Sequence, residues 1–157
     1  MIVIITGSVG SGKSTKIKSL FDRYGGAGVW LPAVTQHQTR IGQDLMDLRS
    51  GQRAAYTRRT GALPPHWQEA ARLDTMSFSR QGQRLLHSAL QAARCGDGPL
   101  FIDEIGPLEL MGHGAAPLIP QIKAQTRRLI FLAIRTSCLD AAIGLFALRP
   151  GCVLHLD

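Results

Sequence analysis

The chain is poor in cysteine, acidic side chains and long apolar runs, and each shortage excludes a class of protein. Three cysteines (95, 138 and 152) lie far apart without metal-ligand spacing, as suits a reducing compartment. Five histidines are scattered with no H-x-x-x-H pair, which argues against a transition-metal site. No apolar run approaches the about 20 residues that cross a bilayer, and the short opening run lacks the basic leader of a signal peptide. We therefore expect a cytoplasmic protein with no membrane contact.

Acidic residues number only 11 against 18 lysines and arginines, so the net charge is +7. Much of this charge lies in the basic stretch 49–84, which has only Glu69 and Asp74 as acidic residues. It contains the arginines 49, 53, 58, 59, 72, 80 and 84. A basic field favours polyanions such as nucleotides and nucleic acid, whereas a solvated arginine-rich face is the alternative. Length and composition otherwise fit one globular domain over residues 1–157.

What the chain does contain is the phosphate-loop pattern G-x-x-x-x-G-K-[ST], directly after the apolar run Ile2–Ile5. The glycines let successive N–H groups point at a phosphate, and a helix N-terminus adds favourable partial charge. Lys13 would reach the β- and γ-phosphates, and the Ser14 hydroxyl would bind Mg²⁺. The expected phosphate-binding residues are Gly7, Ser8, Val9, Gly10, Ser11, Gly12, Lys13, Ser14 and Thr15.

Apolar periodicity predicts an α/β fold, in which a mainly parallel sheet is covered by helices. We expect strands over 2–6, 99–105, 129–134 and 152–156, and an extended segment at 29–31 that Pro32 confines to an edge or a strand start. The expected helices cover 13–24, 79–96, 115–125 and 137–148. A β-hairpin insertion pairs 40–48 with 52–57, and 60–78 is mostly loop with one short strand near 71–76.

A second motif is the acidic pair Asp103-Glu104, which ends an apolar strand. Ligands of open parallel sheets bind beyond the carboxyl ends of the strands, so this pair should lie on the same edge as the phosphate loop. Asp103 would then hold Mg²⁺ with Ser14, and Glu104 would orient or deprotonate a water beside the γ-phosphate. The alternative is a capping or surface pair. Because a kinase excludes water from the γ-phosphate, the second carboxylate favours hydrolysis.

These residues resemble the small P-loop nucleoside-triphosphatases first known from thermophiles and also found in animals. Residues 103–110, D-E-I-G-P-L-E-L, fit the D-E-I-G-x-[ML]-E-L strand of that family, and residues 40–48 resemble its R-x-G-F-D segment. The resemblance implies a RecA-like fold, in which an extra strand separates the two motif strands. It also implies Mg²⁺-dependent hydrolysis of nucleoside triphosphates with loose base preference.

Other residues have open roles. Glu109 matches the family motif, and a structural cap or an ion pair is its expected role. Trp30 and Trp67 would either pack or stack on a base, and the loop 64–67 is a candidate contact. An arginine that neutralises the γ-phosphate would come from a set of five candidates. They are Arg58, Arg59, Arg127, Arg128 and Arg135.

The sequence thus favours an enzyme, a Mg²⁺-dependent nucleoside-triphosphatase in which Lys13 and Glu104 are catalytic. A small-molecule or polynucleotide kinase is the first alternative, because the basic stretch 49–84 would suit a polyanionic acceptor. A nucleotide-switched binding module is the second. A monomer or weak oligomer is expected, and the sequence does not fix the base preference.

Overall fold

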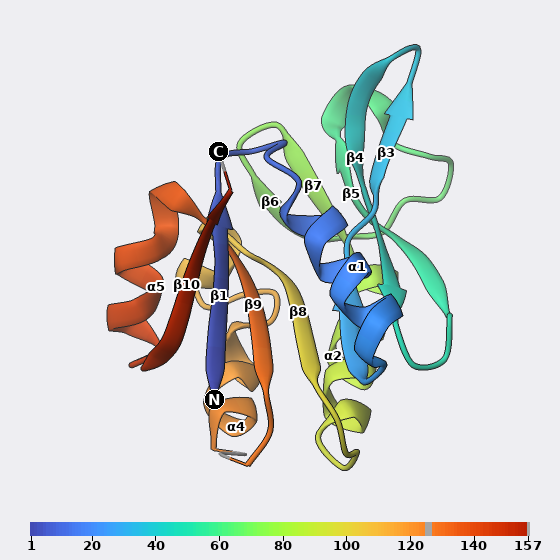
Figure 1. Cartoon of the computed structure of the whole chain (residues 1–157). Helices are drawn as coiled ribbons and strands as arrows, with labels where there is room; N and C mark the ends of the chain where they lie inside the picture. The colour runs from blue at the N-terminus through green and yellow to red at the C-terminus, as the bar shows by residue number, and fades with distance from the viewer. Residues whose placement is uncertain (125–126, 157) are drawn as a thin grey trace.

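The computed structural model describes residues 1–124 and 127–156, and in them one mixed sheet of ten strands is flanked by helices on both faces (Figure 1). The strands are β1 (Ile2–Gly7), β2 (Ala27–Trp30), β3 (Ala33–Gln36), β4 (Thr39–Asp47), β5 (Arg53–Arg59), β6 (Glu69–Leu73), β7 (Met76–Ser79), β8 (Leu100–Ile105), β9 (Ile130–Arg135) and β10 (Pro150–Leu156). The α-helices are α1 (Lys13–Tyr24), α2 (Arg80–Ala93), α3 (Pro107–Leu110), α4 (Ile119–Lys123) and α5 (Leu139–Leu145).

The sheet has a parallel half and an antiparallel half, in the order β10-β1-β9-β8-β2-β4-β5-β7-β6 with β3 paired to β4. All pairings from β10 to β2 are parallel, and those from β2 onward are antiparallel. Strand β9 lies between the two motif strands β1 and β8, which confirms the extra strand expected of a RecA-like sheet. Because parallel strands point the same way, β1, β8, β9 and β2 all end at one edge.

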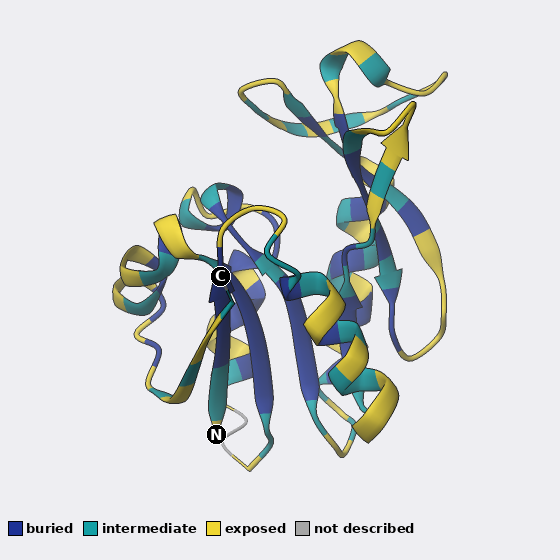
Figure 2. Cartoon of the chain, turned by 45° about the horizontal axis from the view of Figure 1, so that its top comes forward, coloured by how far each residue is buried: buried dark blue, intermediate teal, exposed yellow. Residues whose placement is uncertain are grey.

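Strand residues alternate between two apolar layers, because successive side chains of a strand point to opposite faces. Ile4 and Ile102 belong to the larger core under α2, α4 and α5. Their neighbours Ile5 and Phe101 belong to the smaller core, where Ile17 of α1 packs. Figure 2 shows these central strands as the most continuously buried part of the molecule. The parallel strands β1, β9, β8 and β2 are therefore largely buried on both faces and give the phosphate loop a rigid base, whereas the edge strand β10 is more exposed.

The antiparallel half is larger than the single predicted hairpin. The hairpin of β4 and β5 is confirmed, but the prediction for 60–78 is wrong. Two paired strands, β6 and β7, occupy this stretch and turn at Asp74, which has a φ of 53°. The predicted short strand at 71–76 therefore contains the turn between β6 and β7. Its polar residues show no clear strand pattern, and β7 is held in the sheet by its pairing with the neighbouring β5.

Smaller differences concern element ends. Strand β2 is not an edge strand, because it lies between β8 and β4 and ends before Pro32. Short 3₁₀ turns precede α4 and α5, so both helices are shorter than predicted; residue 125 of the predicted helix 115–125 lies outside the described residues. Helix α1 has the predicted bounds, and Ser79 caps α2 by accepting the Gly82 N–H.

Candidate active site

The phosphate loop joins β1 to α1 with a backbone that depends on glycine. Gly10 and Gly12 have φ angles of 84° and 91°, which side chains with a Cβ adopt only at a cost. At Gly7 a Cβ would lie 2.4 Å from the Leu156 carbonyl oxygen, so close packing against β10 also requires glycine. The loop thus takes its curled shape from three positions of the motif.

Lys13 turns back into this loop. Its Nζ donates to the carbonyl oxygens of Gly7 at 3.0 Å and Ser8 at 2.7 Å. The side chain is only 3% exposed, and this burial lowers the pKa of Lys13, an effect that the Glu104 carboxylate opposes. The ammonium therefore lies inside the loop that a phosphate would enter.

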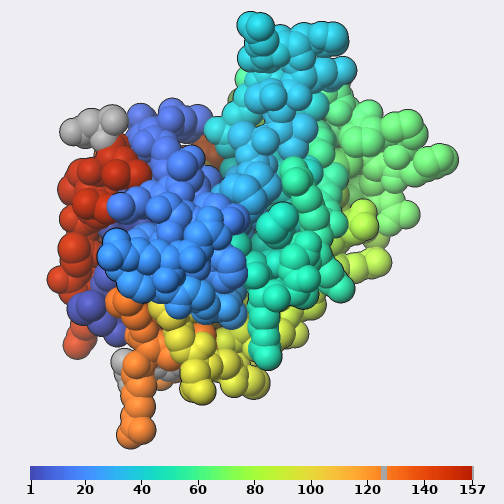
Figure 3. All heavy atoms as spheres, turned by 45° about the vertical axis from the view of Figure 1, so that its right-hand side comes forward, coloured from blue at the N-terminus to red at the C-terminus, as the bar shows by residue number. Residues whose placement is uncertain are grey.

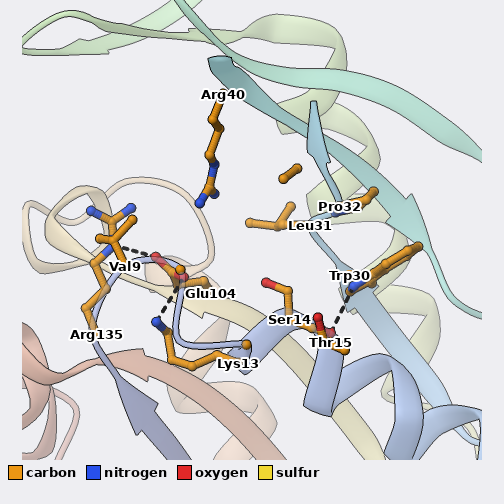
Figure 4. A pocket seen from close by; sticks show the side chains of 13 residues that line it. Val9, Lys13, Ser14, Thr15, Trp30, Leu31, Pro32, Arg40, Glu104 and Arg135 are labelled. Carbon is orange, nitrogen blue, oxygen red and sulfur yellow. Dashed lines mark hydrogen bonds and ion pairs between the residues drawn. The ribbon is translucent and has the colours of Figure 1, made fainter. Parts of the chain in front are cut away.

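A pocket of about 400 Å³ opens over the loop (Figure 4). Its walls come from the phosphate loop and α1, from the segment between β2 and β3, and from the ends of β4, β8 and β9. The lining residues are Val9, Gly10, Gly12, Lys13, Ser14, Thr15, Trp30, Leu31, Pro32, Ala33, Arg40, Glu104 and Arg135. Three of the predicted phosphate-binding residues, Gly7, Ser8 and Ser11, do not line this pocket. The carbonyl oxygens of Gly7 and Ser8 instead accept hydrogen bonds from Lys13.

Glu104 lies on the pocket wall between two cations. Its Oε2 is 3.9 Å from Lys13 Nζ, and its Oε1 accepts a hydrogen bond from Nε of Arg135. The parallel pairing of β1 with β9 places Gly7 opposite Arg135, so the register of the sheet brings this guanidinium to the loop. Figure 4 shows Glu104 between the two side chains. Two fixed cations thus hold this carboxylate at the edge of the pocket.

Asp103 lies below the wall, with only 1% of its surface exposed. Its Oδ2 accepts the Leu31 N–H at 3.0 Å, whereas Oδ1 is buried and has no hydrogen-bond partner in the described residues. Burial raises the pKa of Asp103 to about 7, and the Leu31 N–H and the nearby Ser14 hydroxyl act in the opposite direction. A buried carboxylate oxygen without a hydrogen-bond partner indicates a position where a water or a metal ion can bind.

These donors fit a hard divalent cation. In the described ranges, no three histidine, cysteine or acidic side chains come together as a metal site. A Mg²⁺ ion does not need such a cluster, because it binds one or two carboxylates together with substrate phosphates and water. The orphaned Asp103 oxygen beside the Ser14 hydroxyl provides that kind of partial shell. The structure places the Ser14 hydroxyl close enough to Asp103 to lower the pKa of its carboxyl, and their joint role as metal ligands stays a prediction.

Among the five arginine candidates, only Arg135 lines the pocket. Arg58 is buried against Asp44 at 2.5 Å, and Arg128 donates to the Gly98 carbonyl at the opposite edge of the sheet. The sequence reasoning missed Arg40, which enters the pocket from the start of β4. Its only sequence signal is an arginine at the start of the segment between the two phosphate-site motifs.

The tryptophans have different surroundings. Trp30 lines the pocket, and its ring N–H donates to the Ser14 carbonyl at 3.0 Å, so it both packs against α1 and faces the cleft. Trp67 donates to the Ser77 hydroxyl at 2.7 Å. The loop 64–67 lines a separate cavity, and nothing in its position ties it to the phosphate loop.

Glu109 is a structural cap, as expected. Its Oε2 accepts the Gly106 N–H at 2.9 Å and its Oε1 accepts the Ala115 N–H at 3.4 Å, so the carboxyl joins the two ends of a tight loop. Burial raises its pKa to about 7. The three cysteines are free, and in residues 1–124 and 127–156 no helix has the length and apolar character that spanning a membrane requires.

A strand, a phosphate loop and a helix, with an acidic strand end separated from that strand by one intervening strand, define a P-loop nucleotide-binding protein of RecA-like type. A model of the family described as NTPase matches residues 2–145. The chain therefore belongs to the NTPase family and is an enzyme of the nucleoside-triphosphatase class, which confirms the resemblance seen in residues 103–110.

Two curated relatives carry the name nucleoside-triphosphatase THEP1. The protein from Methanopyrus kandleri is 24% identical over 156 residues, which cover 96% of this chain and 83% of that protein. The protein from Methanothermobacter thermautotrophicus is 33% identical over 116 residues, which cover 70% of this chain and 63% of that protein.

Two solved structures share the fold. The crystal structure of THEP1 from the hyperthermophile Aquifex aeolicus has a TM-score of 0.78 at 22% identity and covers all of this chain and 90% of its own. The solution structure of a human cancer-related nucleoside triphosphatase has a TM-score of 0.61 at 26% identity, with 99% and 87% covered.

Proposed function

We propose that the protein catalyses Mg²⁺-dependent hydrolysis of nucleoside 5′-triphosphates, ATP and GTP among them, to the diphosphate and phosphate, with Glu104 orienting the water. One observation carries this proposal. The Glu104 carboxylate lies on the wall of the phosphate-loop pocket, 3.9 Å from Lys13 and paired with Arg135. A carboxylate fixed at that position can accept a hydrogen bond from a water next to the terminal phosphate.

The phosphate loop would bind the triphosphate through the backbone N–H groups of residues 7–15. Lys13 is held by two loop carbonyls without ligand. In the complex its ammonium would exchange these for the more strongly charged β- and γ-phosphate oxygens, because hydrogen bonds between two ionised groups are stronger than those to a neutral carbonyl. Binding would thus rely on groups that are already in the loop.

Ser14 and Asp103 would hold the Mg²⁺ ion, and the orphaned Asp103 oxygen supports this role. The bound ion would neutralise the charge that develops on the transferred phosphoryl group. Asp103 is fixed for this task by the N–H of Leu31, the residue directly after β2, which the parallel pairing of β2 with β8 brings close to the end of β8. Lys13 in turn balances the charge of Glu104.

Hydrolysis is preferred over kinase chemistry because a fixed carboxylate recruits water, whereas a kinase must exclude it. The basic stretch 49–84 also offers less free charge than its composition suggests. Arg53 and Arg58 both pair with Asp44, and Arg72 pairs with Glu69. We further propose one P-loop domain over residues 1–157 that works in the cytoplasm as a monomer or weak oligomer.

The test is phosphate release from eight ribo- and deoxyribonucleoside triphosphates, with Mg²⁺ or with a chelator. Glu104→Gln should keep nucleotide affinity and lose roughly 10²–10⁴ in kcat, the usual contribution of a positioned base. Lys13→Ala should weaken binding itself. Asp22→Asn, which removes an exposed carboxylate of α1, is the matched control and should behave like the wild type.

Full turnover by Glu104→Gln would remove Glu104 from the proposed role. Turnover that is unchanged by the chelator would exclude the metal. A phosphate yield that falls as an added alcohol or polynucleotide becomes phosphorylated would instead favour a kinase.

A further inference from the structure

Arg40 stands out among the cations of the pocket because nothing in the described residues holds it. Lys13 is bonded to two carbonyls and Arg135 to Glu104. No hydrogen bond or ion pair in residues 1–124 and 127–156 involves the Arg40 guanidinium, although the side chain is half-buried and lines the pocket. Guanidinium groups in clefts are normally paired, and their planar fork matches phosphate oxygens.

The side chain of Arg40 also points into the pocket. The residue is the second of β4, opposite Thr35 of β3, so it belongs to the hairpin that projects beyond α1 (Figure 3). In Figure 4 its side chain extends from that hairpin down into the pocket, toward the wall that carries Glu104. The positive charge of Arg40 contributes to lowering the pKa of Lys13, so the two cations lie within electrostatic range of each other.

The charge balance of the pocket identifies the partner. Three cations, Lys13, Arg40 and Arg135, face one wall carboxylate, Glu104. Lys13 and Arg135 both contact that carboxylate and Arg40 does not, so the three cations exceed the wall carboxylate by two charges. A nucleoside triphosphate brings more negative charge than a diphosphate, and the additional charge is on the terminal phosphate beside Glu104 and Lys13.

We propose that Arg40 binds the terminal phosphate of the nucleotide from the β3–β4 hairpin, and so gives the enzyme its preference for triphosphates over diphosphates. Arg135 remains on Glu104 and orients it. This inference rests on the proposed hydrolytic function, which it deepens by assigning a substrate-contacting residue. The reaction is unchanged: water attacks the terminal phosphorus, the bond to the bridging oxygen breaks, and the diphosphate leaves with its electron pair. The proton of the water passes to the released phosphate, and Arg40 compensates the negative charge throughout.

The experiment compares the wild type with Arg40→Ala and Arg40→Lys in two measurements. The first is the affinity of each protein for a non-hydrolysable triphosphate analogue and for the matching diphosphate, with Mg²⁺ present. The second is kcat for phosphate release. Arg59→Ala is the matched control, because Arg59 is an exposed arginine of the neighbouring strand β5 and does not line the pocket.

We expect Arg40→Ala to lose affinity for the triphosphate analogue but not for the diphosphate, and to lose up to roughly 10³-fold in kcat, as arginines on the transferred phosphate do. Arg40→Lys should recover part of both, since it restores the charge but not the planar fork. Thermal unfolding should be unchanged in both variants, because the guanidinium has no protein partner in the described chain.

Three outcomes would overturn the inference. One is an Arg40→Ala protein that keeps the wild-type preference for triphosphate and the wild-type kcat. Another is an equal loss of affinity for both nucleotides, which would place the guanidinium on a phosphate that they share. The third is a loss by Arg59→Ala as large as that of Arg40→Ala. If instead the wild type releases no phosphate, the proposed hydrolysis fails, while the binding comparison still decides the role of Arg40.

Discussion

Replacing Glu109 with glutamine should make the protein more stable than the wild type at alkaline pH but not at acidic pH. The side chain is 5% exposed, and burial raises its pKa from the ordinary 4.5 to about 7. A carboxyl whose pKa is raised by folding binds its proton more tightly in the native state. Its contribution to stability is therefore complete below pH 4.5 and is lost as the pH rises to 7.

The magnitude follows from the size of the shift. Between 4.5 and about 7, at about 1.4 kcal/mol per pKa unit, the native state loses on the order of 3 kcal/mol relative to a side chain that stays neutral. Glutamine has nearly the shape of the protonated acid, and its carbonyl oxygen can still accept the Gly106 N–H that Glu109 accepts at 2.9 Å. Its amide NH₂ cannot accept the Ala115 N–H that Glu109 Oε1 accepts at 3.4 Å, so this weaker hydrogen bond is lost. The variant should therefore be less stable than the wild type at pH 4 by the worth of that hydrogen bond, about 1 kcal/mol, and more stable at pH 8.5.

Urea unfolding at both pH values measures this difference. Asp103, whose pKa burial also raises to about 7, titrates in both proteins and cancels in the comparison. Glu109→Ala is the control, because it leaves the Gly106 and Ala115 N–H groups without their acceptor and should destabilise at every pH. A wild type that is more stable than Glu109→Gln at pH 8.5 would refute the reasoning, since the two N–H groups would then hold the carboxylate ionised.

Two further predictions concern the same region. The hydroxyl of Tyr56 is buried without a partner in the described residues, so Tyr56→Phe should raise the free energy of unfolding by about 1 kcal/mol, whereas a loss measured by urea titration would reveal a hidden hydrogen bond. Gly114→Ala should destabilise by about 2–3 kcal/mol, because its φ is 59° and a Cβ would lie 2.0 Å from Glu109 Oε1. Gly112→Ala, at φ 86° with open space around the Cβ, should lose only the stability that a positive φ costs a residue with a Cβ. Equal losses of stability in the two variants would contradict the proposed clash.

The parallel half of the sheet was predictable because its sequence is dominated by local signals. Continuous apolar runs such as Ile2–Ile5 and Leu129–Ile134 are typical of strands in a parallel sheet that is covered on both faces. The glycines of the phosphate loop determine the turn between strand and helix. The meeting of Asp103 with Ser14 followed from one topological rule, that parallel strands end at the same edge.

The antiparallel half was less predictable because its strands are exposed on one side and depend on non-local partners. Strand β6 alternates half-buried and exposed residues, and the turn at Asp74 carries no glycine. Arg40 was missed for the same reason: a polar strand residue gives no sign of the direction of its side chain until the register with β3 is known. Local sequence thus determines the phosphate loop, and tertiary pairing determines what faces it.

The chain leaving β2 shows why the two halves form one site. Leu31 donates its N–H to Asp103 in the parallel half, and the next residue, Pro32, accepts the Asp44 N–H from β4 in the antiparallel half at 3.0 Å. Proline has no N–H to extend the ladder of β2, so this strand ends where the sheet changes direction. The β3–β4 hairpin is therefore anchored within one residue of the carboxylate that would hold the metal. The hairpin that carries Arg40 and the carboxylate of Asp103 are thus bonded to two successive residues of one segment.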